Sequence, residues 1–105
     1  MSRLTSSTRA PGDATAPDAA AFVSARFLVQ APTDPGLLPR LLEPFAKLGT
    51  APTRVHATCE SGDGTEMTVD LRLSPAVPRT AELIELALRR VVGVRQLIAV
   101  VEPAT

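Results

Sequence analysis

His56 and Cys59 are the only histidine and the only cysteine of the chain, and they lie three residues apart. A nucleophilic cysteine needs a base within hydrogen-bond reach. The residues around them alternate in polarity as in a β-strand, where positions three apart point to opposite faces. The two side chains are therefore not expected to form a Cys–His pair. We predict that Cys59 is a small buried core residue. We predict that His56 is an exposed strand residue, with a role at a partner surface as the alternative.

The acidic residues give two weaker signals. Asp63 and Gly64 resemble part of a calcium loop. The alternating acidic ligands and the closing glutamate of such a loop are missing, so a turn is favoured. Asp70 and Arg72 lie two residues apart and share one face of a predicted strand. We interpret them as solvated charges on a sheet face.

The segment Thr33-Asp34-Pro35-Gly36-Leu37 is the remaining candidate for a binding site. It precedes a predicted helix, and the free N–H groups at the start of a helix can bind a carboxylate. Gly36 allows a ligand to approach the backbone closely. From the residues alone, the segment is either a turn with a helix cap or the carboxylate pocket of a small-molecule binding domain.

Composition excludes several classes of function. The chain has 105 residues, eleven basic and eleven acidic, and a formal net charge of zero. Without net charge there is no long-range field to attract nucleic acid or an anionic membrane. No apolar run approaches the roughly 20 residues of a transmembrane helix. One cysteine and one histidine do not provide a cysteine or histidine metal cluster, and no cofactor is expected.

Hydrophobic periodicity places the candidate residues on six elements. Four segments alternate apolar and polar residues, and two repeat apolar residues at helical spacing. The turn sequence 61–64 predicts a tight hairpin. Thr80 is the expected N-cap of the second helix, and Gly49 and Gly93 are the expected stops of the two helices. The predicted strands are 22–30, 53–60, 65–73 and 94–102, and the predicted helices are 37–49 and 79–92.

This element order predicts an α+β, ferredoxin-like βαββαβ sandwich. Right-handed crossovers would place both helices on one face of a four-stranded antiparallel sheet. The spatial order of the strands would be fourth, first, third, second. The other face of the sheet would stay open and would carry Arg26, His56, Asp70 and Arg72.

The domain is expected to span residues 22–102. Residues 1–21 are almost all Ala, Ser, Thr, Pro and Gly, which cannot bury enough apolar surface to offset chain entropy. They also contain no apolar stretch long enough for a secretory signal. We predict a disordered N-terminal tail, a short C-terminal tail at 103–105 and a cytoplasmic location.

Two other functions of this topology are disfavoured. RNA-binding modules stack bases on aromatic residues of the sheet face. The predicted strand 65–73 offers none there, and the chain has no Trp or Tyr. A small phosphatase would need a phosphate-binding loop and a water-positioning amide such as Asn. The chain contains no Asn, and its loop at 31–36 is acidic and rich in proline.

The whole segment 22–102 resembles an ACT domain, the small regulatory module of amino-acid metabolism. The resemblance begins with Thr33-Asp34-Pro35-Gly36-Leu37-Leu38, which opens the first helix, and continues through its apolar stripe to Gly49. The second half is most similar to short acetolactate synthase small subunits. It is carried by the runs Thr68-Val69-Asp70-Leu71, Pro78-Arg79-Thr80-Ala81-Glu82-Leu83-Ile84 and Val91-Val92-Gly93-Val94.

The resemblance implies a non-catalytic regulatory subunit that activates or feedback-regulates a thiamine-diphosphate-dependent large subunit in branched-chain amino-acid biosynthesis. It implies an effector site at residues 33–37 and a homodimer or higher oligomer formed through the sheet edge and helices. Thr33 stands where the family often uses Asn or Asp. We expect Arg26, His56 and Arg72 to contact the partner. The alternative is a free-standing amino-acid sensor that acts on another enzyme or regulator.

Overall fold

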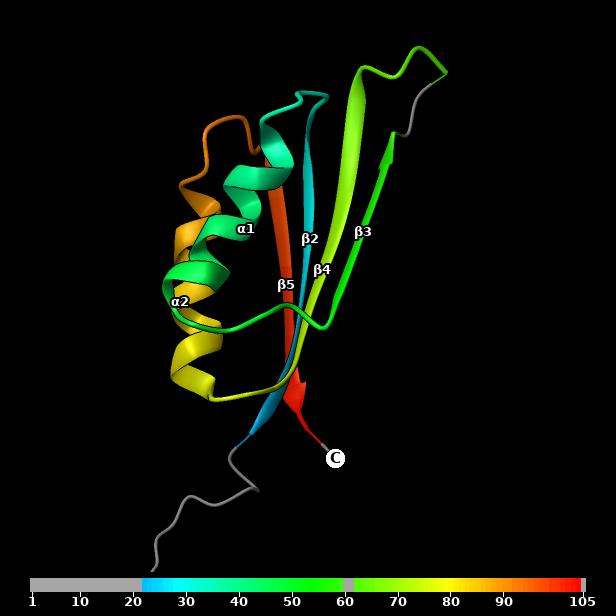
Figure 1. The fold of residues 1–105 in the computed structure, drawn as a ribbon. Coiled ribbons are helices and arrows are strands. Elements are labelled where there is room, and N and C mark those ends of the chain that lie inside the picture. The colour runs from blue at the N-terminus through cyan, green and yellow to red at the C-terminus, as the bar shows by residue number, and fades with distance from the viewer. Residues whose placement is uncertain (1–21, 60–61, 105) are drawn as a thin grey trace, which may run out of the picture.

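A computed structural model describes residues 22–59 and 62–104 of the chain (Figure 1). The predicted N-terminal tail, residues 1–21, lies outside the described residues. Six elements follow one another in the predicted order βαββαβ. They are β2 (Val23–Pro32), α1 (Leu37–Lys47), β3 (Arg54–Cys59), β4 (Glu66–Ala76), α2 (Pro78–Arg89) and β5 (Gln96–Pro103).

The four strands form one antiparallel sheet in the order β3-β4-β2-β5. Both helices cover the same face of this sheet (Figure 1). The ferredoxin-like topology and the strand order predicted from the sequence are confirmed. The middle strands pair with neighbours on both sides, which leaves β3 and β5 as the two edges.

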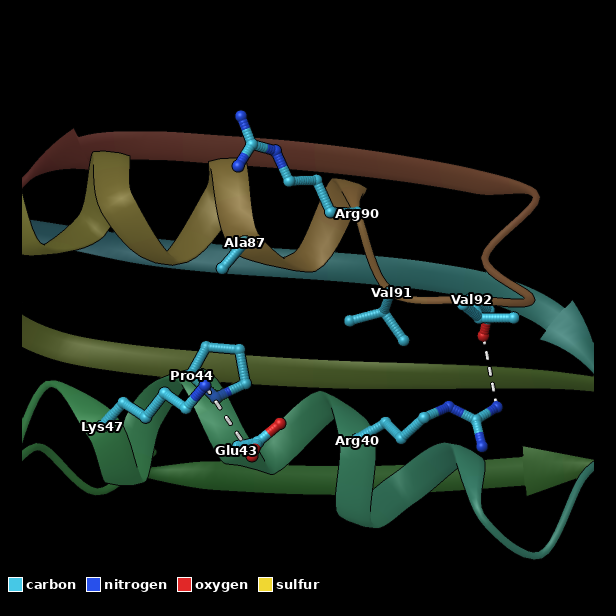
Figure 2. A pocket seen from close by; sticks show the side chains of 8 residues that line it. All are labelled: Arg40, Glu43, Pro44, Lys47, Ala87, Arg90, Val91 and Val92. Carbon is cyan, nitrogen blue, oxygen red and sulfur yellow. Dashed lines mark hydrogen bonds and ion pairs between the residues drawn. The ribbon is translucent and has the colours of Figure 1, made fainter.

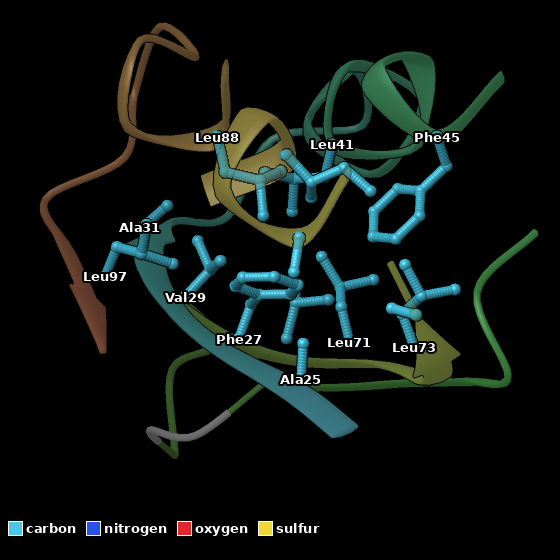
Figure 3. Close-up of a cluster of buried hydrophobic side chains, with 14 of the residues drawn as sticks. Ala25, Phe27, Val29, Ala31, Leu41, Phe45, Leu71, Leu73, Leu88 and Leu97 are labelled. Carbon is cyan, nitrogen blue, oxygen red and sulfur yellow. The ribbon is translucent and has the colours of Figure 1, made fainter. Parts of the chain in front are cut away.

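The core lies between the sheet and the two helices (Figure 3). Alternate residues of β2 and β4 point into it, as the period-two pattern predicts. Leu37, Leu41 and Phe45 of α1 and Ala81, Ile84 and Leu88 of α2 close it from the other side. The buried sheet residues are Ala25, Phe27, Val29, Ala31, Val69, Leu71, Leu73, Ala76 and Leu97.

Helix α1 begins at Leu37, so Pro39 lies in its first turn, where a missing N–H costs no helical bond. Pro44 lies inside the helix. The predicted stripe is shifted by a residue at the start, because Leu37 is buried. It also ends early, since Leu48 is 41% exposed. Gly49 has a φ of +69° and ends the helix as predicted.

Helix α2 starts and ends earlier than the sequence indicates. Pro78 is its first residue, and Val77 occupies the N-cap position without a side-chain hydrogen bond. The prediction that Thr80 is the N-cap is wrong, because proline at the first helical position already lacks an orphan N–H. The helix ends at Arg89, and Gly93, with a φ of +100°, follows in the turn toward β5.

Strand β3 differs most from expectation. All six of its residues are exposed, including Cys59, so the prediction that Cys59 is a core residue is wrong. The physical reason is its position: β3 is an edge strand, and Figure 1 shows it standing apart from the helix layer. Its sequence alternation is real, but no helix covers the apolar side.

Strand β4 is longer than predicted. The sequence places a loop from residue 74, whereas the strand continues to Ala76 and carries a cis peptide bond between Ser74 and Pro75. Ala76 is buried and pairs with Val23 of β2. Pairing with the neighbouring strand therefore holds the Ser-Pro sequence in the sheet.

Candidate functional site

The loop that joins β2 to α1 is tied to the start of β4. The Thr33 amide donates a hydrogen bond to the carbonyl oxygen of Thr65 at 3.0 Å. The Thr33 hydroxyl donates to the carbonyl oxygen of Gly64. Both bonds fix the first residue of the predicted effector segment against the β3–β4 connection.

Asp34 closes the loop on itself. Its Oδ1 accepts a hydrogen bond from the Gly36 amide at 3.1 Å, and its Oδ2 accepts one from Arg40 Nη2 at 2.9 Å. The Arg40 guanidinium, followed by the Gly36 amide, holds the pKa of the Asp34 carboxyl below its usual range. The Leu37 amide donates to the Asp34 carbonyl oxygen. The chain's own carboxylate thus occupies donors that an external carboxylate would need.

Gly36 permits a close approach, as predicted, but the approaching group belongs to the chain. A Cβ at position 36 would lie 2.7 Å from Arg40 Nη1. The absence of a side chain lets the guanidinium lie against the backbone at the start of α1. The Gly36 backbone itself, with a φ of −86°, is unstrained.

Arg40 also reaches the end of the second helix. Its Nη2 donates to the carbonyl oxygen of Val92 at 3.2 Å, as Figure 2 shows. Sequence reasoning did not identify Arg40 as part of the site. The one local signal was a cation six residues after Asp34, and nothing in the sequence places Val92 beside it. Arg40 therefore links the effector segment to the α2–β5 turn.

A groove of about 380 Å³ lies between the two helices beside Arg40 (Figure 2). Its apolar part comes from Pro44 of α1 and from residues at the end of α2. Its charged part carries three cations and one carboxylate, that of Glu43. The lining residues are Arg40, Glu43, Pro44, Lys47, Ala87, Arg90, Val91 and Val92.

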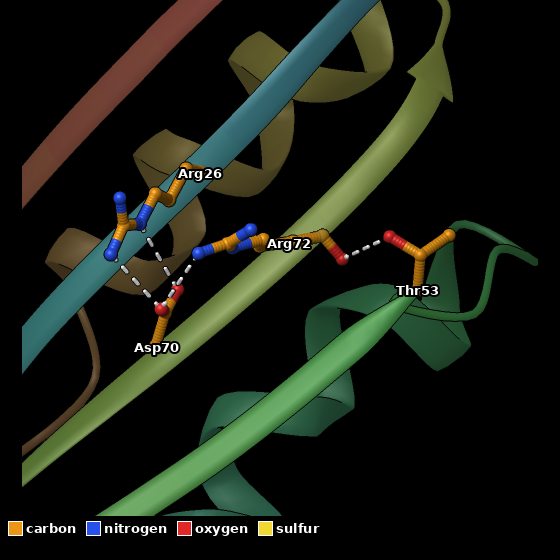
Figure 4. Close-up of polar contacts among 4 residues, drawn as sticks. All are labelled: Arg26, Thr53, Asp70 and Arg72. Atoms are coloured by element: carbon orange, nitrogen blue, oxygen red, sulfur yellow. Dashed lines mark hydrogen bonds and ion pairs between the residues drawn. The ribbon is translucent and has the colours of Figure 1, made fainter.

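The open face of the sheet carries a second cluster, shown in Figure 4. Arg26 binds Asp70 with two bonds, Nε to Oδ1 at 3.4 Å and Nη2 to Oδ2 at 3.2 Å. Arg72 Nη2 lies 3.5 Å from the same Oδ2. Asp70 is only 9% exposed, so its interpretation as a solvated charge is wrong. The two arginine side chains that flank it cover the carboxylate.

His56 shares the open face but not the cluster. It lies opposite Asp70 in the β3–β4 register and is exposed. Its ring makes no polar contact with the residues that the structure describes. The structure thus brings Arg26 and Arg72 together through Asp70 and leaves His56 at the edge of the sheet.

A depression of about 230 Å³ opens beside the two arginines. Ser24 and Arg26 of β2, Arg72 of β4, and Val100 and Glu102 of β5 line it. The arrangement suits the binding of a polar or charged group by hydrogen bonds and ion pairs.

The described residues offer little for bond-breaking chemistry. Within residues 22–59 and 62–104, no three or more His, Cys, Asp or Glu side chains gather in a way that could hold a metal ion. No helix in this part of the chain is both long enough and apolar enough to cross a membrane. The two polar sites described above are built from ion pairs and backbone groups.

No protein-family model matches the chain, and no curated protein is significantly similar to it. Two solved structures share its fold. GqqA, described as a novel type of quorum quenching acylase, is 19% identical with a TM-score of 0.62, over 93% of this chain and 50% of that one. The regulatory subunit of aspartate kinase from Thermus flavus is 18% identical with a TM-score of 0.49, over 79% of this chain and 52% of that one.

The chain therefore spans about half the length of the solved chains that it matches. At these identities the likeness shows the fold alone. It agrees with the sandwich of one four-stranded sheet and two helices described above.

Proposed function

We propose that this chain is a non-catalytic regulatory domain of the ACT type, which senses an amino acid and acts on a partner enzyme of amino-acid metabolism. The observation that carries the proposal is the Arg40 bridge. It joins the effector segment, residues 33–37, to the end of α2 through Asp34 and Val92. A ligand that changed the Asp34–Arg40 contact would also change a contact on a different element, which is what a regulatory domain requires.

The partner in this proposal is the large subunit of acetolactate synthase. Support comes from the residue pattern of the second half, which resembles short small subunits of that enzyme. Thiamine-diphosphate chemistry would belong to the large subunit, and this chain would contribute binding surface and regulation. Arg26, His56 and Arg72, which share the open face, are the proposed contact residues.

The proposal includes a homodimer formed along β3. The side chains of Val55, Ala57 and Cys59 point toward the helix side of the sheet and are all exposed. An edge strand presents unpaired backbone N–H and C=O groups, which favour pairing with another strand. An antiparallel copy of β3 would satisfy those groups, and the two α1 helices would lie over the joint apolar strip.

The likeness to an acylase raises an enzyme as the rival function. Hydrolysis by nucleophile and base requires both groups within hydrogen-bond reach. The His56 ring lies at a sheet edge and contacts no hydroxyl, thiol or carboxylate among the described residues. In contrast, the ion pairs of Asp34 and Asp70 are suited to recognition, so we favour the regulatory function.

The decisive experiment mixes the full chain with a purified acetolactate synthase large subunit. We expect a complex on size-exclusion chromatography and a rise in acetolactate formation. No complex and no stimulation would refute the acetolactate synthase partnership. A parallel assay with N-acyl substrates of varied chain length tests the rival, and acyl hydrolysis by the chain alone would refute the non-catalytic function.

Calorimetry of the full chain against the twenty amino acids tests the sensing function. The regulatory proposal expects heat from one amino acid or a small group of them. The variant Arg40→Gln should lose this response, and Arg79→Gln, an exposed change of the same charge on α2, should keep it. Binding without large-subunit stimulation would favour the free-standing sensor, whereas a flat response to all twenty would exclude it.

A further inference from the structure

Three arginines lie side by side across the open face of the sheet. Arg54 of β3 is opposite Arg72 of β4, and Arg72 is opposite Arg26 of β2. We call these three residues the arginine row. Neighbouring strands lie about 4.8 Å apart, so the row extends roughly 10 Å across the sheet.

The row carries more positive charge than the described acidic groups around it compensate. Arg26 and Arg72 share the single carboxylate of Asp70. Arg54 has no ion-pair partner in the described part of the chain. The other nearby carboxylate, Glu102, lines the depression beside Arg26 and Arg72 without an ion pair to either. The Arg72 Nε is buried and finds no acceptor within the described residues.

Such a row is unfavourable for the isolated domain. Like charges directly opposite one another on adjacent strands destabilise a sheet. A buried donor without an acceptor adds a further cost. Local choices that conflict with stability are expected at functional surfaces. The row therefore indicates a surface that an anionic group completes.

We propose that the arginine row docks an acidic segment of a partner protein. Two carboxylates would fit a row of this length, one over Arg54 and one between Arg26 and Arg72. Such a spacing arises from residues two apart on a strand or three to four apart on a helix. This deepens the proposed function, because it assigns a chemistry to the partner surface and adds Arg54 to it.

The surface beside the row specifies the rest of the segment. Val100 is opposite Arg26 on β5, and Ile98 precedes it on the same face. They are 44% and 48% exposed. An apolar side chain beside the acidic residues would cover them, with burial worth about 25 cal/mol per Å² of apolar surface. The partner segment is thus acidic over β3, β4 and β2 and apolar over β5.

Phosphate-bearing partners fit this surface less well than carboxylates. The chain has no net charge, whereas nucleic-acid affinity rests on many phosphate contacts within a basic field. Glu102 and Asp70 also flank the row and would repel a continuous phosphate backbone. A short segment with separate carboxylates can avoid them.

The test is an NMR titration of the isotopically labelled full chain with hexaglutamate, with inorganic phosphate and decathymidylate as competing probes. We expect hexaglutamate to shift backbone signals of Arg54, Arg72 and Arg26 and their strand neighbours. Arg54→Gln should weaken hexaglutamate binding about fivefold, and Arg54→Gln with Arg72→Gln about tenfold or more. Arg54 lies on an exposed strand outside the Asp70 cluster, so its replacement should leave the fold intact. Arg79→Gln is the matched control on the helix layer.

Shifts confined to the helix layer, or none at all, would overturn the proposal. A stronger response to decathymidylate or phosphate than to hexaglutamate would also overturn it, in favour of a phosphate-bearing ligand. The titration does not depend on acetolactate synthase, so it distinguishes failure of the row from failure of the proposed partner. If the large subunit does bind, Arg54→Gln should weaken that complex and Arg79→Gln should not.

Discussion

Arg40 holds Asp34 at 2.9 Å from the first turn of the helix that Asp34 precedes. The same nitrogen of Arg40 lies 3.2 Å from the carbonyl oxygen of Val92, which is 52 residues away along the chain. A single guanidinium therefore joins the β2–α1 loop to the α2–β5 turn. The state of the Asp34 carboxylate is linked to both.

The contact predicts a specific pH dependence. The Arg40 guanidinium lowers the pKa of Asp34, so the stabilisation is complete above the ordinary Asp value of about 3.9. It is lost as the pH falls through the lower pKa of the folded state. Thermal unfolding of wild type and Asp34→Asn from pH 2 to 7 should show wild type ahead at neutral pH. The difference should disappear at the acid end, and a constant difference at all pH values would contradict the contact.

Replacing Gly36 with alanine should displace Arg40 without straining the backbone. The new Cβ would meet Arg40 Nη1 at 2.7 Å, and a flexible side chain can move away. We expect the Asp34 pKa, followed by NMR, to rise toward its usual value because its cation has left. Gly62→Ala, where the Cβ would meet open space, is the control and should leave that pKa unchanged. An unaltered Asp34 pKa in both variants would show that Arg40 is not displaced.

Asp70→Ala should destabilise the domain. It removes the carboxylate that Arg26 and Arg72 share, and it leaves three arginines adjacent on one face. We expect a loss of about 1–3 kcal/mol in the free energy of unfolding, measured with urea. Glu82→Ala breaks an exposed ion pair with Arg79 and should cost no more than about 1 kcal/mol. Equal losses in the two variants would mean that the Asp70 cluster adds nothing beyond a surface pair.

The Cys59 thiol should react readily with a thiol reagent in native buffer, because the residue is exposed on an edge strand. Absorbance after mixing with dithionitrobenzoate, in dilute protein with and without urea, checks this. The two rates should agree within a few fold. A thiol that reacts only in urea would place Cys59 in a core, as the sequence alone suggested.

The proposed dimer predicts that Val55→Arg favours the monomer. Val55 is 41% exposed on the apolar side of β3, and an arginine there would place like charges at the joint between copies. Sedimentation over a range of concentrations gives the oligomeric state. Leu86→Arg, at a 49% exposed position on α2, is the control. A wild-type monomer at all concentrations would exclude the dimer, and an unchanged dimer in Val55→Arg would exclude β3 as its interface.

The fold itself could be read from periodicity. Phe27 and Val29 of β2 and Leu71 of β4 alternate with polar neighbours, and they are fully buried as that pattern predicts. Helix boundaries were harder. Thr80 looks like an N-cap locally, but Pro78 was already able to start the helix. Local signals compete at element ends, and the packing of the helix on the sheet decides between them.

Burial at the sheet edge could not be predicted. Val55, Ala57 and Cys59 alternate like core residues, yet they are exposed because neither helix extends over β3. Asp70 shows the reverse case. It looks like an exposed strand residue, but Arg26 and Arg72 from two strands cover it. Alternation identifies a face, whereas the neighbouring elements determine whether that face meets solvent.

The sequence alone determined the order of the elements, the strand order of the sheet and the loop at residues 33–37, because these follow from short-range periodicity, turn chemistry and the handedness of crossovers. Only the tertiary structure decided that Arg40 binds Asp34 and Val92, and that Arg54, Arg72 and Arg26 stand in one row. These contacts depend on strand register and on the approach of residues distant in the chain. No local pattern encodes either of them.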